Sequence, residues 1–356
     1  MNLEDRFEKF LIHEDELQVI LNELYKESEK FEIMLPFTLR EPALEINFET
    51  LEIKINVGKN DFQLPVKTAK KVKSEISNYG DVLDALFSAG ILKPENENEI
   101  INFLKNKMME AEKFTSSPRP FAIAFDTNCF MLKVPSNLLQ KELRKIPCVY
   151  SELVLEELGL LAQHKLNGII EHLKQLYPSS AHELSFLRYC ETRIARRAKM
   201  GIAEVNKLQI EHAGKTIGAK PPNNFSTLSS VERDNQIIES YVKYQEERKV
   251  ELIFLTTDNN ANIRAATKGL ATFYIKQPTN LSNIKINYKS LTKLLYTLSV
   301  MFGYIKLRTG FTTTLIYSTW PGKTFKEWKS DLMKILIPKD IKATQNIRKH
   351  LAVLRT

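Results

Sequence analysis

The sequence of 356 residues contains no uninterrupted apolar run of the ~18 residues that a membrane-spanning helix needs. Its first ten residues, MNLEDRFEKF, are charged and lack the apolar core of a secretory signal peptide. The three cysteines, Cys129, Cys148 and Cys190, cannot all pair with one another, and none belongs to a CxxC motif. These absences predict a cytoplasmic protein with no membrane association, whose cysteines are small core residues in a reducing compartment.

Acidic side chains are missing from one long stretch, because residues 259–326 contain 10 Lys or Arg and no Asp or Glu. The first 50 residues have the opposite bias, with 13 acidic and 5 basic side chains, in a chain of net charge +8. Since a solvated surface usually mixes both signs, the acid-free stretch indicates a face that binds a polyanion. The alternative is a basic protein of uneven composition.

The best linker candidate is TSSPRP at residues 115–120, after which the sequence pattern changes. Before it, residues 3–30 are helical in pattern and residues 44–56 alternate as in a strand or hairpin. After it, short apolar runs alternate with helical segments, which predicts βαβ units and a parallel sheet. Beyond residue 288 we expect a helix, a hairpin and a further helix near residues 324–336.

Two aspartates directly follow strand-like apolar runs, Asp126 after FAIAF and Asp258 after LIFLTT. Because the carboxyl ends of parallel strands share one edge of a sheet, where ligands bind, both are candidates for one site. Glu157 and Asp234 fall on the apolar faces of predicted helices, where an ionised group is costly unless something compensates it. Clustered carboxylates repel one another and stay ionised with a divalent cation between them, and oxygen ligands suit Mg²⁺ or Mn²⁺.

Each of these carboxylates also has a purely structural explanation. Asp126 could cap a turn, and Asp258 could be the N-cap of the helix NNANIRAAT. Glu157 could meet a buried arginine, and Asp234 could lie at the surface or in a salt bridge. The set favours convergence more strongly than its members do, because two acids end strands and two face inward from the intervening helices.

The order of the motifs resembles the PIN-domain ribonuclease family over residues 119–276: a hydrophobic strand followed by DTN, then VLEEL, DNQII and FLTTDNN. The resemblance implies a three-layer α/β/α fold with a central parallel sheet. It also implies a metal-dependent endonuclease that acts more often on RNA than on DNA. It assigns catalysis and metal binding to Asp126, Glu157, Asp234 and Asp258. The auxiliary polar residues that it implies are Thr127 or Asn128 after the first aspartate, and Asn259 or Asn262 in the last motif.

Three domains are therefore expected. Residues 1–116 form an α+β N-terminal domain, residues 117–288 the PIN-like domain, and residues 289–356 a small, basic α+β C-terminal domain. The PIN-like domain contains a basic helical insertion near residues 168–228, which makes it longer than compact members of the family. We expect the basic side chains of this insertion and of the C-terminal hairpin to bind nucleic acid, through Arg193, Arg196, Arg197, Lys306 and Arg308.

The favoured function is a metal-dependent endoribonuclease that hydrolyses phosphodiester bonds. Two alternatives stay open. One is a non-catalytic RNA-binding or scaffold protein on a PIN-like fold, and the other is a structure-selective DNA nuclease. The acidic N-terminal domain is a candidate for docking a second copy of the chain or a partner protein.

Overall fold

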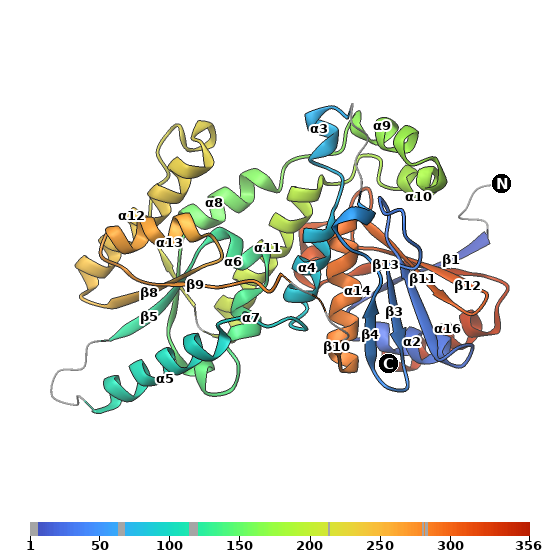
Figure 1. Ribbon diagram of the computed structural model, residues 1–356, viewed down its shortest axis with the longest axis horizontal. Coiled ribbons are helices and arrows are strands. Elements are labelled where there is room, and N and C mark those ends of the chain that lie inside the picture. The colour runs from blue at the N-terminus through green and yellow to red at the C-terminus, as the bar shows by residue number, and fades with distance from the viewer. Residues whose placement is uncertain (1–5, 63–67, 114–119, 213, 280, 282–283) are drawn as a thin grey trace. The chain divides into compact units, whose positions relative to one another are not determined.

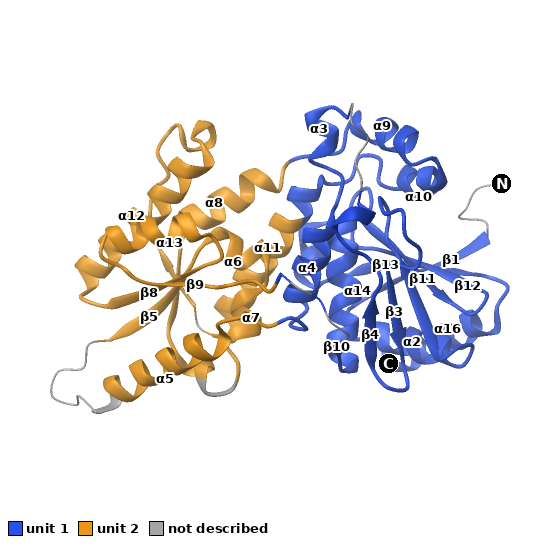
Figure 2. Cartoon of the chain, in the orientation of Figure 1, with its two compact units in different colours: residues 1–92, 164–196, 279–356 blue, residues 93–163, 197–278 orange. Residues whose placement is uncertain are grey.

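The computed structural model describes residues 6–62, 68–113, 120–212, 214–279, 281 and 284–356. The chain forms two compact units (Figures 1 and 2). Unit 1 consists of residues 1–92, 164–196 and 279–356, and unit 2 of residues 93–163 and 197–278. Except for Pro120, the linker predicted at residues 115–120 lies outside the described residues.

Unit 2 contains a five-stranded sheet in the order β7-β6-β5-β8-β9, and all its strand pairs are parallel. Every residue of β5 is buried, as expected for a central strand with helices on both faces. Its neighbour β8 pairs with it from Phe121 opposite Glu251 to Phe125 opposite Leu255. The strands are β5 (Phe121–Phe125), β6 (Cys148–Ser151), β7 (Lys215–Ile217), β8 (Glu251–Thr256) and β9 (Ala271–Tyr274).

Helices flank this sheet (Figure 1), so the predicted α/β/α architecture with a central parallel sheet is confirmed. The strand expected before Asp258 and the helix expected after it correspond to β8 and α13. The helices of this unit are α5 (Glu97–Lys113), α6 (Thr127–Met131), α7 (Val134–Leu138), α8 (Glu152–Leu161), α12 (Ser230–Arg248) and α13 (Asn259–Thr267). Helix α11 (Arg193–Glu211) contributes residues 197–211.

Gly201 on α11 allows a close approach to the helices that follow β5 and β6. A Cβ atom at this position would lie 3.0 Å from Cδ2 of Leu158 and 3.2 Å from the backbone nitrogen of Met131. A larger side chain would push α8 or α6 away, because interiors are closely packed. Since α8 also contains Glu157, this contact helps to fix that carboxylate.

Unit 1 contains an eight-stranded antiparallel sheet in the order β1-β13-β12-β11-β2-β3-β4-β10. Strands from both ends of the chain form this sheet, since the C-terminal strands β13, β12 and β11 lie between β1 and β2. The strands are β1 (Phe7–Ile12), β2 (Lys30–Met34), β3 (Leu44–Asn47), β4 (Glu52–Ile55), β10 (Ile284–Lys285), β11 (Tyr304–Thr309), β12 (Thr312–Tyr317) and β13 (Met333–Pro338).

This shared sheet differs from the sequence prediction, which divides its strands between an N-terminal and a C-terminal domain. Two segments predicted to be helical also contain strands: β1 lies within residues 3–30, and β13 begins within residues 324–336. These two strands are hydrogen-bonded partners, with Phe7 opposite Pro338 and Ile12 opposite Met333. Such a pairing across more than 300 residues leaves no local pattern, so periodicity within one window cannot detect it.

The longest helix of unit 1, α14, is buried over most of its length and packs against α4 and the sheet. Residues 168–196 of the predicted basic insertion belong to this unit rather than to the parallel-sheet unit. The helices are α2 (Leu17–Tyr25), α3 (Lys70–Lys73), α4 (Tyr79–Ser88), α9 (Ile169–Leu176), α10 (Ala181–Ser185), α14 (Tyr288–Phe302), α15 (Phe325–Lys329) and α16 (Lys342–Leu354).

Candidate active site

Asp126 lies at the carboxyl end of the central strand β5 and is 8% exposed. Its Oδ1 accepts a hydrogen bond of 2.7 Å from the backbone nitrogen of Cys129, which makes it the N-cap of α6. Its Oδ2 accepts a hydrogen bond from the hydroxyl of Thr256, the last residue of β8. The parallel register explains this contact, because Phe125 lies opposite Leu255 and the next residues of the two strands are Asp126 and Thr256.

Glu157 on α8 is 6% exposed and is connected to the end of β5 through Thr127. The Thr127 hydroxyl donates to Oε2 of Glu157 at 2.6 Å. The other carboxylate oxygen accepts from Nε of Arg233 at 3.0 Å. Glu157 therefore meets a half-buried arginine, close to the structural alternative of a buried one, and it also contacts the residue after Asp126.

Asp234 and Asp258 complete the predicted set. Asp234 is half-buried on α12, and its Oδ2 accepts from a terminal nitrogen of Arg264 at 2.8 Å. Asp258 is the N-cap of α13, where its Oδ1 accepts from the backbone nitrogen of Asn260 at 2.8 Å. The structural alternatives are thus also present: Asp234 is in a salt bridge, and Asp258 and Asp126 are N-caps.

The charges of these acids influence one another. Burial raises the pKa of Asp126 from its ordinary value of 3.8 to about 6, although hydrogen bonds from Thr256 and Cys129 act in the opposite direction. Burial also raises the pKa of Asp234, to about 7, and the negative charge of Glu157 adds to this effect. Asp126 and Asp258 raise the pKa of Asp234 further, while Arg264 lowers it. The negative charges of Glu157, Asp126 and Asp258 therefore all raise the pKa of Asp234.

The auxiliary residues differ in their surroundings. Thr127 is buried and bonded to Glu157, whereas Asn128 is exposed in the first turn of α6. Asn262 on α13 has a buried Oδ1 that finds no hydrogen-bond partner among the described residues. Asn259 is the first residue of α13 and is exposed. Of the two asparagines in the last motif, Asn262 is thus the one with a buried oxygen to offer.

Four further residues connect the site and are not among the residues predicted from the sequence. Arg233 and Arg264 neutralise acids, and Thr256 donates to Asp126. The hydroxyl of Tyr241 donates to the carbonyl of Phe125 at 2.8 Å and accepts from the backbone nitrogen of Ser151 at 3.1 Å, which ties α12 to the ends of β5 and β6. The only sequence signal for the first of these is the RD pair, which places an arginine next to a candidate acid.

The residues predicted to bind nucleic acid are mostly engaged by acids or by the backbone. Arg193 donates to Asp81 at 2.6 Å, Lys306 lies 2.7 Å from Glu183, and Arg308 donates to Glu32 at 2.6 Å. These partners come from distant parts of the sequence, so folding neutralises two basic residues of the acid-free stretch. Arg197 is half-buried in unit 2.

Arg196 is buried, with 3% exposure, and donates to the backbone carbonyls of Val300, Glu191 and Met301 at 2.7, 2.8 and 3.2 Å. Its guanidinium group is thus bound to backbone carbonyl groups inside unit 1. This burial removes Arg196 from the residues that can contact nucleic acid, because a phosphate cannot reach its guanidinium group.

No helix in the described part of the chain is long and apolar enough to cross a membrane. Comparison with curated proteins found no match. The family model of the PIN domain, however, matches residues 123–276. The matched segment begins within β5 and ends just after β9, so it includes the parallel sheet and all four carboxylates. The chain therefore contains a PIN domain, a nuclease fold whose enzymes usually depend on divalent metal ions.

Proposed function

We propose that this protein is a metal-dependent endonuclease that hydrolyses phosphodiester bonds in RNA. The observation that carries the proposal is the position of Asp126, a buried carboxylate at the end of the central strand of the PIN segment. Its charge and those of Glu157 and Asp258 all act on Asp234. Accumulated negative charge in a buried place is costly, and a divalent cation is the simplest species that offsets it.

The chemistry of the donor groups fits Mg²⁺ or Mn²⁺. All four acids offer carboxylate oxygens, which hard cations prefer. The Oδ1 of Asn262 adds a buried amide oxygen that has no hydrogen-bond partner in the described part of the chain. Such groups in native proteins call for an explanation such as an ion or water. The residues that would hold the ion are thus Asp126, Glu157, Asp234 and Asp258, with Asn262 as an auxiliary oxygen.

Binding of an ion requires local rearrangement. In the described residues, no three His, Cys, Asp or Glu side chains form a group that could hold a metal ion. Arg233 and Arg264 instead bind Glu157 and Asp234 directly. We infer that the two guanidinium groups compensate these carboxylates in the metal-free protein and move aside when a cation binds.

When bound, a divalent ion activates water for attack at phosphorus and offsets charge on the phosphate. The protein's own groups act before and beside this chemistry. The hydroxyl of Thr256 and the backbone nitrogen of Cys129 fix both oxygens of Asp126, and Thr127 orients Glu157. Once released from the carboxylates, Arg233 and Arg264 can donate to phosphate oxygens, which suit the geometry of a guanidinium group.

A non-catalytic nucleic-acid-binding protein is the second candidate, and the arginine contacts favour it. An arginine that stays on Glu157 and another that stays on Asp234 would exclude a cation from two of the four acids. RNA is proposed as the substrate because the motifs resemble those of PIN-domain ribonucleases. A structure-selective DNA nuclease is tested by the same experiment.

The three cysteines are buried thiols with no disulfide partners, which suits a reducing cytoplasm, and we propose that location. Self-association, or docking of a partner protein through the N-terminal residues, stays a prediction. Self-association is measurable by light scattering of the purified protein across a range of concentrations.

The test of the proposed function is cleavage of a fluorescent RNA and a DNA of the same sequence, with Mg²⁺, with Mn²⁺ and with EDTA. We expect internal cleavage of RNA that needs a metal ion and is lost in Asp126→Asn and Glu157→Gln. The matched control is Glu156→Gln, because Glu156 is the exposed neighbour of Glu157 on the same helix. Cleavage in EDTA, or equal rates for Glu157→Gln and Glu156→Gln, would refute the four-carboxylate mechanism. Binding without cleavage under every condition would favour the second candidate.

A further inference from the structure

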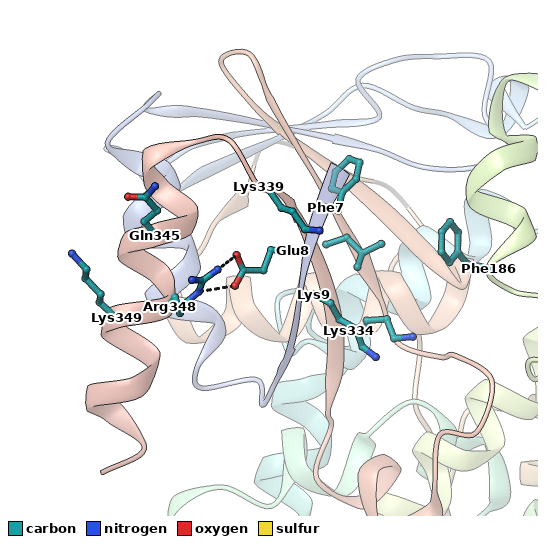
Figure 3. A pocket seen from close by; sticks show the side chains of 10 residues that line it. Phe7, Glu8, Lys9, Phe186, Lys334, Lys339, Gln345, Arg348 and Lys349 are labelled. Atoms are coloured by element: carbon teal, nitrogen blue, oxygen red, sulfur yellow. Dashed lines mark hydrogen bonds and ion pairs between the residues drawn. The ribbon is translucent and has the colours of Figure 1, made fainter. Parts of the chain in front are cut away.

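Unit 1 has a cavity of its own at the edge of its antiparallel sheet (Figure 3). Its volume is about 810 Å³, within the range of sites that hold small organic ligands. Edge strand β1, its neighbour β13 and helix α16 supply most of the lining, and Phe186 from the chain after α10 completes it. We call this cavity the edge groove.

The edge groove is strongly positive. Five basic side chains line it against one carboxylate, and that carboxylate is already neutralised, because Glu8 binds Arg348 through two hydrogen bonds of 2.9 and 2.6 Å. The cations lie on both sides of β1: Figure 3 shows Glu8 turned toward Arg348 on α16, and Lys9 on the other side with Lys334. Lys9 and Lys349 are exposed to solvent. Separated cations of this kind suit a chain of phosphates better than one isolated anion.

Aromatic rings lie among these cations. Lys9 is opposite Leu336 and Phe7 is opposite Pro338 in the antiparallel register, so Phe7 and Lys9 share one face of the sheet. Phe186 is half-buried, and its ring packs 5.8 Å from that of Tyr317 on β12, which holds it in place. Flat rings among lysines on a sheet face match the needs of single-stranded nucleic acid, whose bases stack and whose phosphates pair with cations.

Other ligand classes fit this lining less well. A metal cation is repelled by five basic groups, and an apolar molecule offers no negative charge to the exposed Lys9 and Lys349. An acidic peptide satisfies the charges but offers no flat group to the two phenylalanines. The combination of positive charge and half-buried aromatic rings therefore favours a nucleic acid strand with unpaired bases.

We propose that the edge groove binds single-stranded nucleic acid, with phosphates on Lys9, Lys334 and Lys349 and a base on Phe186. The choice of an RNA probe rests on the proposed function, whereas the binding chemistry is shared by single-stranded RNA and DNA. This surface is separate from Lys306 and Arg308, whose charges are held by Glu183 and Glu32.

The test measures the affinity of the full chain for a fluorescein-labelled uridine 12-mer in EDTA, at several salt concentrations. Each phosphate contact on a single strand contributes about 0.7 to the slope of log affinity against log salt. Lys9→Gln/Lys349→Gln should therefore lower the slope by about 1.4. The matched control is Lys70→Gln/Lys71→Gln, which removes the same charge from two exposed residues of α3 in the same unit. Equal slopes for the two double variants would overturn the proposal.

A second comparison tests base stacking. Phe186→Leu keeps an apolar side chain against Tyr317 but removes the flat ring, so it should weaken binding of the uridine 12-mer about fivefold or more. It should leave the affinity for an abasic 12-mer of equal charge unchanged. The control is Phe311→Leu, because Phe311 is a fully exposed phenylalanine of unit 1 outside the groove. An equal loss for both probes would show that the ring does not bind a base.

A deoxyuridine 12-mer run in parallel tells whether the groove accepts ribose, deoxyribose or both, and the proposal stands with any of these. Polyglutamate of similar charge should compete weakly, and competition as strong as that of unlabelled uridine 12-mer would assign the groove to acidic peptides instead. Because binding is measured in EDTA, it is independent of cleavage. If the protein binds through the groove but never cleaves, only the proposed nuclease function is refuted. If it cleaves but the Lys9→Gln/Lys349→Gln variant has the same salt slope of affinity as its control, only the groove proposal is refuted.

Discussion

Replacement of Arg233 by methionine tests whether its guanidinium group occupies the place of a divalent metal ion. Arg233 donates to Oε1 of Glu157 at 3.0 Å, and the side chains of the pair are 17% and 7% exposed. Without Arg233, Glu157 keeps only the hydroxyl of Thr127 as a partner among the bonds described here. Breaking a buried ion pair from one side costs 3–5 kcal/mol, and the partial exposure of Arg233 places the expected loss near the lower end, at about 3 kcal/mol.

The assay is calorimetric unfolding of Arg233→Met and wild type, each in EDTA and in Mn²⁺. In EDTA the variant should be less stable by about 3 kcal/mol. A cation that takes over the charge of Glu157 should restore most of this loss, since binding at 100 times its Kd is worth about 2.7 kcal/mol. Mn²⁺ should therefore stabilise the variant more than wild type, in which the arginine must first move.

The matched control is Arg248→Met, because Arg248 is exposed at the end of the same helix. It should change stability by less than about 0.5 kcal/mol and should not alter the response to Mn²⁺. If Arg233→Met is as stable as this control in EDTA, the ion pair does not hold Glu157. If Mn²⁺ stabilises neither protein, the carboxylates do not bind the ion, and the compensation argument is refuted.

Three further substitutions test the same site and its surroundings. Because burial raises the pKa of Asp126 from 3.8 to about 6, stability present below pH 3.8 is lost as the pH rises to about 6. Asp126→Asn should therefore raise the metal-free melting temperature at pH 8 and not at pH 3.5, and a difference independent of pH would contradict this. Gly201→Ala should be less stable than Gly159→Ala by about 1–2 kcal/mol. The reason is that a Cβ at Gly201 meets Leu158 and Met131, whereas one at Gly159 meets no described residue within 4 Å. Equal melting temperatures would show that α11 can shift freely. Arg196→Met should lower stability by about 2–4 kcal/mol, because three carbonyl groups lose a donor, and should not weaken RNA binding by the folded protein; the reverse result would place Arg196 at the nucleic acid.

The acids at the strand ends of the candidate site could be predicted because they depend on the order of residues within a short stretch of sequence. A short apolar run followed directly by an aspartate predicts both a buried strand and a carboxylate at its end, and Asp126 and β5 agree with this. Helical periodicity likewise placed Glu157 on an inward face, where the structure has it buried. Local pattern was sufficient in these cases because the strand or helix sets the direction of the side chain.

The partners of the carboxylates could not be predicted in the same way. Arg264 reaches Asp234 from the helix after β8, and Arg233 reaches Glu157 from α12. Which arginine meets which acid depends on how three helices pack on one sheet. The sequence shows only that arginines and acids are both present.

The distribution of charge along the sequence was the least reliable predictor of the basic surface. The acid-free stretch of residues 259–326 predicts an unneutralised basic surface, yet Lys306 and Arg308 pair with Glu183 and Glu32. The edge groove takes its cations from residue 9 and from residues 334–349 instead. Charge along the chain and charge on the surface differ because folding brings together segments that are distant in sequence.

The sequence by itself determined the PIN domain, since each of its motifs joins a strand or helix to the acid beside it in the chain. Only the tertiary structure decided that the two ends of the chain share one antiparallel sheet, and that this sheet carries a basic groove lined by Phe7 and Phe186. The physical reason is the range of the interactions. Capping, periodicity and strand-end chemistry act within a few residues, whereas β1 meets β13 through hydrogen bonds whose partners are more than 300 positions apart.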